Sequence, residues 1–149
     1  LGIRKAFENS ETTSNDGMDI VLITVNTDTK TIKYSGAYRP LYIIRNKELI
    51  EYKATKYAIG SKDILDKDFK TNVIPYEDGD CIYMLSDGYP DQFGGPYNKK
   101  FKTRVLKDMF LEIHHQPMEK QKELIHQRYL DWKGDFEQVD DILICGIQL

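Results

Sequence analysis

Residues 80–88 read Asp80-Cys81-Ile82-Tyr83-Met84-Leu85-Ser86-Asp87-Gly88. The five consecutive apolar residues 81–85 predict a strand buried on both faces, because a strand with one solvated face would alternate apolar and polar residues. The strand ends in a carboxylate, Asp87, followed by Gly88. A charge at the end of an interior strand is costly unless a compensating group, such as a cation, lies beside it. Asp-Gly is also a common turn dipeptide, so this stretch alone fits a plain turn as well as a site.

The composition is that of an ordinary globular protein. The chain has 149 residues, enough for one domain with a sizeable core, of which 40% are hydrophobic and 30% charged. The formal net charge of −3 and the lack of a lysine or arginine cluster argue against nucleic-acid binding. No apolar run approaches the roughly 20 residues of a membrane helix, and no signal-peptide pattern opens the chain. The first residue is Leu1, not Met, so we expect a piece of a longer protein.

The two cysteines, Cys81 and Cys145, both lie in apolar, strand-like segments. We expect buried free thiols, which are typical of proteins from a reducing cytoplasm. His114 and His115 are adjacent, so on a helix they would point to different faces, and no cysteine lies near them at zinc-binding spacing. The pattern therefore predicts a cytoplasmic domain and does not favour a zinc site.

Hydrophobic periodicity divides the chain into strands and helices. Strands are predicted at residues 19–26, 31–35, 41–45, 48–53, 69–75, 81–85 and 139–147. Apolar residues at helical spacing predict two amphipathic helices, residues 99–114 and 118–133, the second ending at Gly134. The stretch 89–96 contains Pro and Gly and is expected to be a loop. The last predicted strand is expected to be buried, like the strand at 81–85.

The order of these elements predicts the fold class. Strands joined as hairpins are antiparallel, and two helices laid over such a sheet make an α+β layered domain. One sheet with helices on a single face would leave its other face uncovered, whereas two stacked sheets would cover it. The residue pattern leaves both arrangements open.

Two carboxylate clusters frame two of the apolar strands. Asp87 and Asp91 follow the strand at 81–85, and Asp140 and Asp141 begin the last strand. If these strands are antiparallel neighbours, the clusters meet at one edge of the sheet. Carboxylate oxygens suit Mg²⁺ or Mn²⁺. No nucleophile elbow or glycine-rich phosphate loop is present, so the pattern favours metal-assisted hydrolysis. The alternative is a small binding domain whose aspartates merely end strands.

Several motifs occur in an order that resembles one protein family. They are Asp-Gly-Met-Asp (16–19), Gly-Ala-Tyr-Arg-Pro-Leu-Tyr (36–42), Ala-Ile-Gly (58–60), Gly-Asp-Cys-Ile-Tyr-Met-Leu-Ser-Asp-Gly-Tyr-Pro-Asp-Gln (79–92) and Val-Asp-Asp-Ile-Leu (139–143). Together they resemble the SpoIIE-type branch of the metal-dependent serine/threonine protein phosphatases, the PPM superfamily. The stretch Gln-Phe-Gly-Gly-Pro (92–96) resembles phosphatase domains attached to bacterial sensor proteins.

The resemblance implies a β-sandwich flanked by helices, with a two-metal centre of Mn²⁺ or Mg²⁺ at one end. It implies that a metal-bound hydroxide attacks phosphoserine or phosphothreonine on a signalling protein directly. By the motif match, Asp87 and Asp140 are expected to be metal ligands. Gly88 would permit the close turn beside the site, and Asp91 and Asp141 are expected to support it.

The chain also departs from the family pattern. Nothing in residues 1–20 matches the family's early Gly-Asp motif, and Leu143 stands where Thr commonly follows Asp-Asp-Ile. We therefore expect residues 1–149 to be the C-terminal portion of a single phosphatase domain, N-terminally truncated, with an incomplete metal site and little activity. The alternative is a non-catalytic regulatory or protein-interaction module. The resemblance implies a phosphoprotein substrate and an upstream sensor domain as partners, and it leaves a homodimer open.

Overall fold

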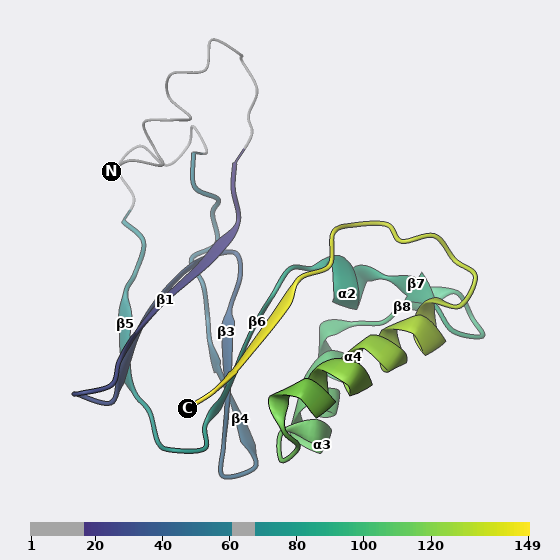
Figure 1. Cartoon of the computed structure of the whole chain (residues 1–149). Coiled ribbons are helices and arrows are strands. Elements are labelled where there is room, and N and C mark those ends of the chain that lie inside the picture. Colours follow the sequence, from purple (N-terminus) through teal and green to yellow (C-terminus); the bar gives the residue numbers. More distant parts are fainter. Residues whose placement is uncertain (1–16, 61–67) are drawn as a thin grey trace. The chain divides into compact units, whose positions relative to one another are not determined.

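The computed structural model of the chain describes residues 17–60 and 68–149. The chain divides into two compact units: Leu1–Leu41 with Glu51–Tyr76, and Tyr42–Ile50 with Glu77–Leu149. Figure 1 labels most of their helices and strands. No helix among the described residues is both long and apolar enough to cross a membrane.

The first unit contains a three-stranded antiparallel sheet in the order β1-β2-β5. Its strands are β1 (Ile20–Asn26), β2 (Thr31–Ala37) and β5 (Asn72–Pro75). Ile32, Tyr34 and Ile74 are buried on one face, whereas Lys33 and Val73 between them are exposed. This alternation is typical of an antiparallel sheet with one solvated face.

An ion pair within this unit joins the start of β1 to the bend after β2. Arg39 Nη2 lies 2.5 Å from Asp19 Oδ2. Nearby, the buried hydroxyl of Tyr34 donates to the carbonyl oxygen of Arg39 at 2.9 Å. A Cβ at Gly36 would overlap both the Tyr34 hydroxyl and the Arg39 carbonyl, so this close packing requires glycine.

The second unit is built on a four-stranded sheet in the order β4-β3-β6-β9. Its strands are β3 (Leu41–Arg45), β4 (Glu48–Tyr52), β6 (Cys81–Leu85) and β9 (Ile144–Gln148). Asn46 and Lys47 connect β3 to β4, both at positive φ (50° and 65°), as a tight hairpin turn demands. β6 is antiparallel to both β3 and β9, so it is an interior strand of this sheet.

Three helices and a short hairpin complete this unit. They are α2 (Gly88–Asp91), β7 (Phe93–Gly94), β8 (Lys99–Lys100), α3 (Thr103–Ile113) and α4 (Met118–Lys133). Cys81 and Tyr83 of β6 pack with Leu106 and Phe110 of α3 in one buried cluster. The Tyr83 and Phe110 rings are stacked, with centroids 4.1 Å apart. The buried face of α3, formed by Leu106, Met109, Phe110 and Ile113, therefore packs against the sheet.

The α+β fold class is confirmed, and the single-sheet alternative is excluded because the described strands form a three-stranded and a four-stranded sheet besides the β7–β8 hairpin. The predictions at 41–45, 81–85 and 118–133 match β3, β6 and α4 in full. Gly134, with φ 51°, follows α4 as predicted.

Four predictions are corrected. Residues 89–96 are not an unstructured loop, because they contain part of α2 and all of β7. The helix predicted from residue 99 begins at Thr103, since Lys99 and Lys100 pair with β7 instead. The strand predicted at 69–75 is regular only from Asn72, and β2 extends past Ser35 to Ala37.

The last strand differs most from expectation. β9 begins at Ile144, not at Val139, and it lies at the edge of its sheet, paired to β6 alone among the described strands. Cys145 is consequently exposed, whereas Cys81 on the interior strand is buried. An apolar run predicts a strand but does not distinguish an interior strand from an edge strand, and the prediction that Cys145 is buried was wrong.

A buried ion pair fixes the beginning of β6. Asp80 is 2% exposed, and Arg45 of β3 donates to both its carboxylate oxygens, through Nε at 3.0 Å and Nη2 at 2.6 Å. The Glu77 amide donates to the same carboxylate at 3.0 Å. The Asp80 carbonyl accepts from the Leu149 amide at 3.0 Å. One aspartate thus joins the ends of three strands.

We expect Arg45→Ala to reduce the free energy of unfolding by about 3–5 kcal/mol, because it leaves the Asp80 carboxylate buried without its cation. Urea unfolding measures this loss. Adding Asp80→Asn to Arg45→Ala should restore part of it, since the stranded charge is removed. No recovery in the double variant would mean that lost packing, not the charge, causes the change. The control Lys120→Ala breaks an exposed pair with Glu123 and should change stability little.

Buried tyrosines predict alkaline destabilisation. Burial raises the pKa of Tyr34 to about 12, and it also raises the pKa of Tyr83 and Tyr89. An unfolded tyrosine has a pKa of about 10, so folding stabilises the neutral hydroxyl of each buried tyrosine. This contribution to the free energy of unfolding is complete below pH ~10 and is lost as the pH rises through about 12. Urea unfolding at pH 8, 10 and 11.5 should show that the free energy of unfolding decreases at the highest pH. Tyr34→Phe should weaken the pH dependence, and Tyr97→Phe, at an 80% exposed side chain, should not.

Candidate metal-binding edge

The pairing of β6 with β9 brings the two carboxylate clusters to one edge of the sheet. The register places Leu85 opposite Ile144, so the end of β6 meets the beginning of β9 (Figure 1). The Ser86 amide donates to the Leu143 carbonyl at 2.9 Å, which continues the ladder by one residue. The antiparallel pairing on which the predicted meeting of the clusters depended is therefore confirmed.

The Ser86 side chain holds the two segments together where the ladder ends. Its hydroxyl donates to the carbonyl oxygen of Asp141 at 2.8 Å and accepts from the Leu143 amide at 2.9 Å. These two backbone groups flank Ile142. The hydroxyl thus replaces the strand partner that the segment before β9 lacks. The sequence gives no sign of this role for Ser86, because a serine beside Asp-Gly has the same pattern in any turn.

Gly88 allows the two segments to approach closely. A Cβ on this buried residue would lie 2.4 Å from the Asp141 carbonyl oxygen and 2.9 Å from its carbonyl carbon. Both atoms belong to the backbone and cannot move aside easily. Glycine is therefore required here for the approach of the distant Asp141 backbone and not for a positive φ, whereas the family resemblance implied only a close turn at this position.

Asp87 lies between the end of β6 and the first turn of α2. The Asp91 amide donates to its carbonyl oxygen at 3.0 Å. The Asp91 carboxylate forms an ion pair with Lys100 of β8 at 2.9 Å. Asp91 therefore closes the turn after Asp87 through its backbone, while its side chain is engaged by the hairpin.

Asp140 and Asp141 lie in the exposed segment before β9. One carboxylate oxygen of Asp140 accepts from the Asp141 amide at 2.7 Å, which orients this carboxylate locally. The side-chain amide of Gln138 donates to the Asp140 carbonyl at 2.8 Å. The segments that carry Asp87 and Asp140 thus meet at one end of the β6–β9 pair.

A buried glutamine absent from the sequence-based predictions joins the same two segments from the other side. Gln92 is 0% exposed, and its side-chain nitrogen donates to the carbonyls of Phe93 and Glu137, both at 2.9 Å. Its side-chain oxygen accepts from the Tyr129 hydroxyl at 3.1 Å. The sequence does not indicate that Gln92 is buried, because a polar residue in a stretch with glycine and proline is usually exposed.

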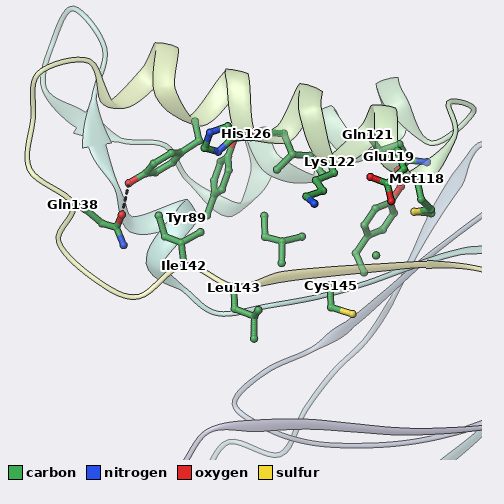
Figure 2. Close-up of a pocket in the computed structure, with 15 residues that line it drawn as sticks. Tyr89, Met118, Glu119, Gln121, Lys122, His126, Gln138, Ile142, Leu143 and Cys145 are labelled. Carbon is green, nitrogen blue, oxygen red and sulfur yellow. Dashed lines mark hydrogen bonds between the residues drawn. The ribbon is translucent and has the colours of Figure 1, made fainter.

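A cavity of about 650 Å³ lies between α4 and β9 in the second unit. Figure 2 shows Met118, Lys122 and His126 of α4 on one side and Leu143 and Cys145 on the other. Tyr89 and Ile125 make it largely apolar. Asp87 and Asp140 do not line it. The cavity is therefore separate from the acidic edge, by which we mean the end of the β6–β9 pair where the segments of Asp87 and Asp140 meet.

The residues of this edge fit Mg²⁺ or Mn²⁺ in kind but not in number. Carboxylate and carbonyl oxygens are the ligands that these hard cations prefer. Within residues 17–60 and 68–149, however, no group of three or more His, Cys, Asp or Glu side chains could hold a metal ion. Asp87 and Asp140, the two predicted ligands, are too few to complete such a site by themselves.

Comparisons with known proteins agree with this architecture. The family described as Stage II sporulation protein E (SpoIIE) matches residues 4–149. The SiaA-PP2C domain of Pseudomonas aeruginosa has a similar structure, with a TM-score of 0.89 and 27% sequence identity. The match covers 98% of this chain and 57% of that one. No curated protein sequence matches the chain.

Two further solved structures share the fold at lower identity. The phosphatase domain of SpoIIE from Bacillus subtilis, presoaked with Mn, has a TM-score of 0.69 at 15% identity, covering 99% of this chain and 63% of that one. The RsbU and RsbW domains of Rv1364c from Mycobacterium tuberculosis have a TM-score of 0.75 at 15% identity. That match covers 98% of this chain and 39% of the other. The chain thus spans less than two thirds of each of these structures. From the family match and the structural similarity, we conclude that the chain belongs to the SpoIIE family of PPM-type phosphatase domains.

Proposed function

We propose that this chain supplies two metal ligands of a domain that hydrolyses phosphoserine or phosphothreonine on a regulatory protein. The observation that carries this proposal is the meeting of the Asp87 and Asp140 segments at the edge where β6 and β9 pair. The 27% identity to the SiaA-PP2C domain over 98% of this chain supports the same class of reaction.

In this proposal, Asp87 and Asp140 hold Mn²⁺ or Mg²⁺. A metal at such a site acidifies a bound water and neutralises charge on the phosphoryl group. Asp87 follows a buried strand and Gly88 keeps the opposite backbone close, so both restrict where the carboxylates can lie. Asp141 presents its amide to Asp140, and Asp91 fixes the turn after Asp87. These are positioning roles.

The proposed site needs ligands beyond those of the described residues. Mg²⁺ requires near-octahedral coordination and binds weakly to one or two carboxylates without further partners. The chain spans 57% of the SiaA-PP2C structure, so additional ligands would come from residues outside the described ones. We therefore expect residues 1–149 alone to bind Mn²⁺ weakly and to have little activity.

A non-catalytic regulatory module is the second candidate. It is favoured by the lack of a group of three metal-ligating side chains among the described residues. Both candidates place the domain in a longer cytoplasmic signalling protein. One solved relative includes a fragment of a regulatory domain, and another carries an RsbW domain, which supports such a context.

We expect Asp87→Asn and Asp140→Asn, each in the complete gene product, to lower kcat/KM by about 100-fold or more, because each removes a charged ligand. Hydrolysis of p-nitrophenyl phosphate and of a phosphoserine peptide with Mn²⁺ measures the loss. The control Asp28→Asn, in the exposed turn between β1 and β2, should keep full activity.

Full activity of Asp87→Asn would show that the ligand assignment is wrong. If Mn²⁺ neither binds nor stabilises the complete gene product, the metal-dependent reaction is excluded with it. A protein that binds Mn²⁺ and hydrolyses neither substrate would favour the non-catalytic module.

A further inference from the structure

Gln92 uses every polar atom of its side chain to join three segments of the second unit. Its nitrogen bonds to Phe93 in its own segment and to Glu137 before β9, and its oxygen to Tyr129 of α4. Its backbone carbonyl accepts from Trp132 Nε1 at 3.1 Å and from the Phe101 amide at 3.0 Å. A side-chain amide with no exposed surface is stable only when it is fully bonded, so this geometry holds Gln92 in one position.

The segment held by Gln92 has no regular secondary structure. Residues 134–143 form no helix or strand and are mostly exposed. Gln92 bonds to this segment at Glu137, just before Asp140, and Ser86 bonds to it at Asp141 and Leu143, just after Asp140. Asp140 therefore lies between two tethers. Both tethers come from residues close to Asp87 in the sequence.

A second contact extends the Gln92 tether toward Asp140. The Tyr129 hydroxyl, bonded to Gln92, also lies 3.4 Å from the side-chain oxygen of Gln138 (Figure 2). Gln138 in turn donates to the Asp140 carbonyl. The 3.4 Å contact is long, so the direct bond from Gln92 to Glu137 is the stronger connection.

We propose that Gln92 is a positioning residue that sets where the Asp140 carboxylate lies relative to Asp87. This inference rests on the proposed function, since it assigns Gln92 to the metal site of that function. Gln92 itself is buried and touches neither metal nor substrate. Its effect passes through the backbone of residues 137–140.

The chain offers a matched control in Gln121, the other glutamine buried to a similar degree, at 1% exposure. Its side-chain nitrogen also donates to two carbonyls, of His114 and Gln116, and its oxygen also accepts from a tyrosine, Tyr83. Gln121 holds the junction of α3 and α4, and its three side-chain bonds go to residues other than 137–143. Losing this amide removes the same kinds of bond without releasing the segment that carries Asp140.

The experiment compares Gln92→Met with Gln121→Met in the complete gene product. We expect Gln92→Met to accelerate amide hydrogen exchange at residues 137–143 in the metal-free protein. We also expect it to raise the Kd for Mn²⁺, measured by calorimetry, by about 10-fold or more. Gln121→Met should lose similar stability in urea and leave both quantities unchanged. If Gln92→Met folds poorly, Tyr129→Phe tests the same tether more mildly, with smaller changes in the same direction.

An equal rise in Kd for both methionine variants would overturn the proposal, because general destabilisation would then explain it. Unchanged exchange and unchanged Kd in Gln92→Met would overturn it as well. If the unsubstituted protein binds no Mn²⁺, the proposed function fails. In that case, amide hydrogen exchange at residues 137–143 in the metal-free protein decides by itself whether Gln92 holds this segment.

Discussion

The antiparallel pairing of β6 with β9 is the constraint on which the rest of the second unit depends. β6 is buried along most of its length, and its neighbours β3 and β9 satisfy its backbone on both sides. At its start, Asp80 is bonded to Arg45 and Leu149, and at its end Ser86 is bonded to Asp141 and Leu143. A slip of one residue would turn every side chain of β9 to the opposite face, so these bonds at both ends also maintain the register.

The two segments of the acidic edge are held in place in different ways. Asp87 lies two residues after the end of an interior strand, whose position is determined by packing on both faces. Asp140 lies on a segment without regular structure, and its position depends on individual side-chain bonds from Ser86, Gln92 and Gln138. Such bonds cost little to lose one at a time when they are exposed, and more when they are buried as at Gln92. The two segments that carry Asp87 and Asp140 are therefore held by different kinds of interaction.

The errors of prediction have local physical causes. Residues 89–100 contain glycine and proline, which favour turns, but here the chain forms a helical turn and a short hairpin packed against Trp132. A Cβ on Gly94 would overlap the Trp132 carbonyl, so this glycine serves close packing between distant residues. Cys145 was expected to be buried because its neighbours are apolar, yet an edge strand leaves such residues exposed. Tertiary contacts outweighed the local signal in each case.

The sequence by itself determined the interior strand at 81–85, the helix at 118–133 with its stop at Gly134, and the order of motifs that identifies the family. Each depends on residues near one another in the chain, where hydrophobic period and turn chemistry act directly. It also placed an aspartate and a glycine at the end of that strand. Only the tertiary structure decided that the segment before β9 meets the end of β6, that Gly88 is needed for the approach of Asp141, and that Gln92 is buried. These features depend on bonds between residues 45 to 57 positions apart, and no local pattern in the chain encodes which distant group a serine or a glutamine will find.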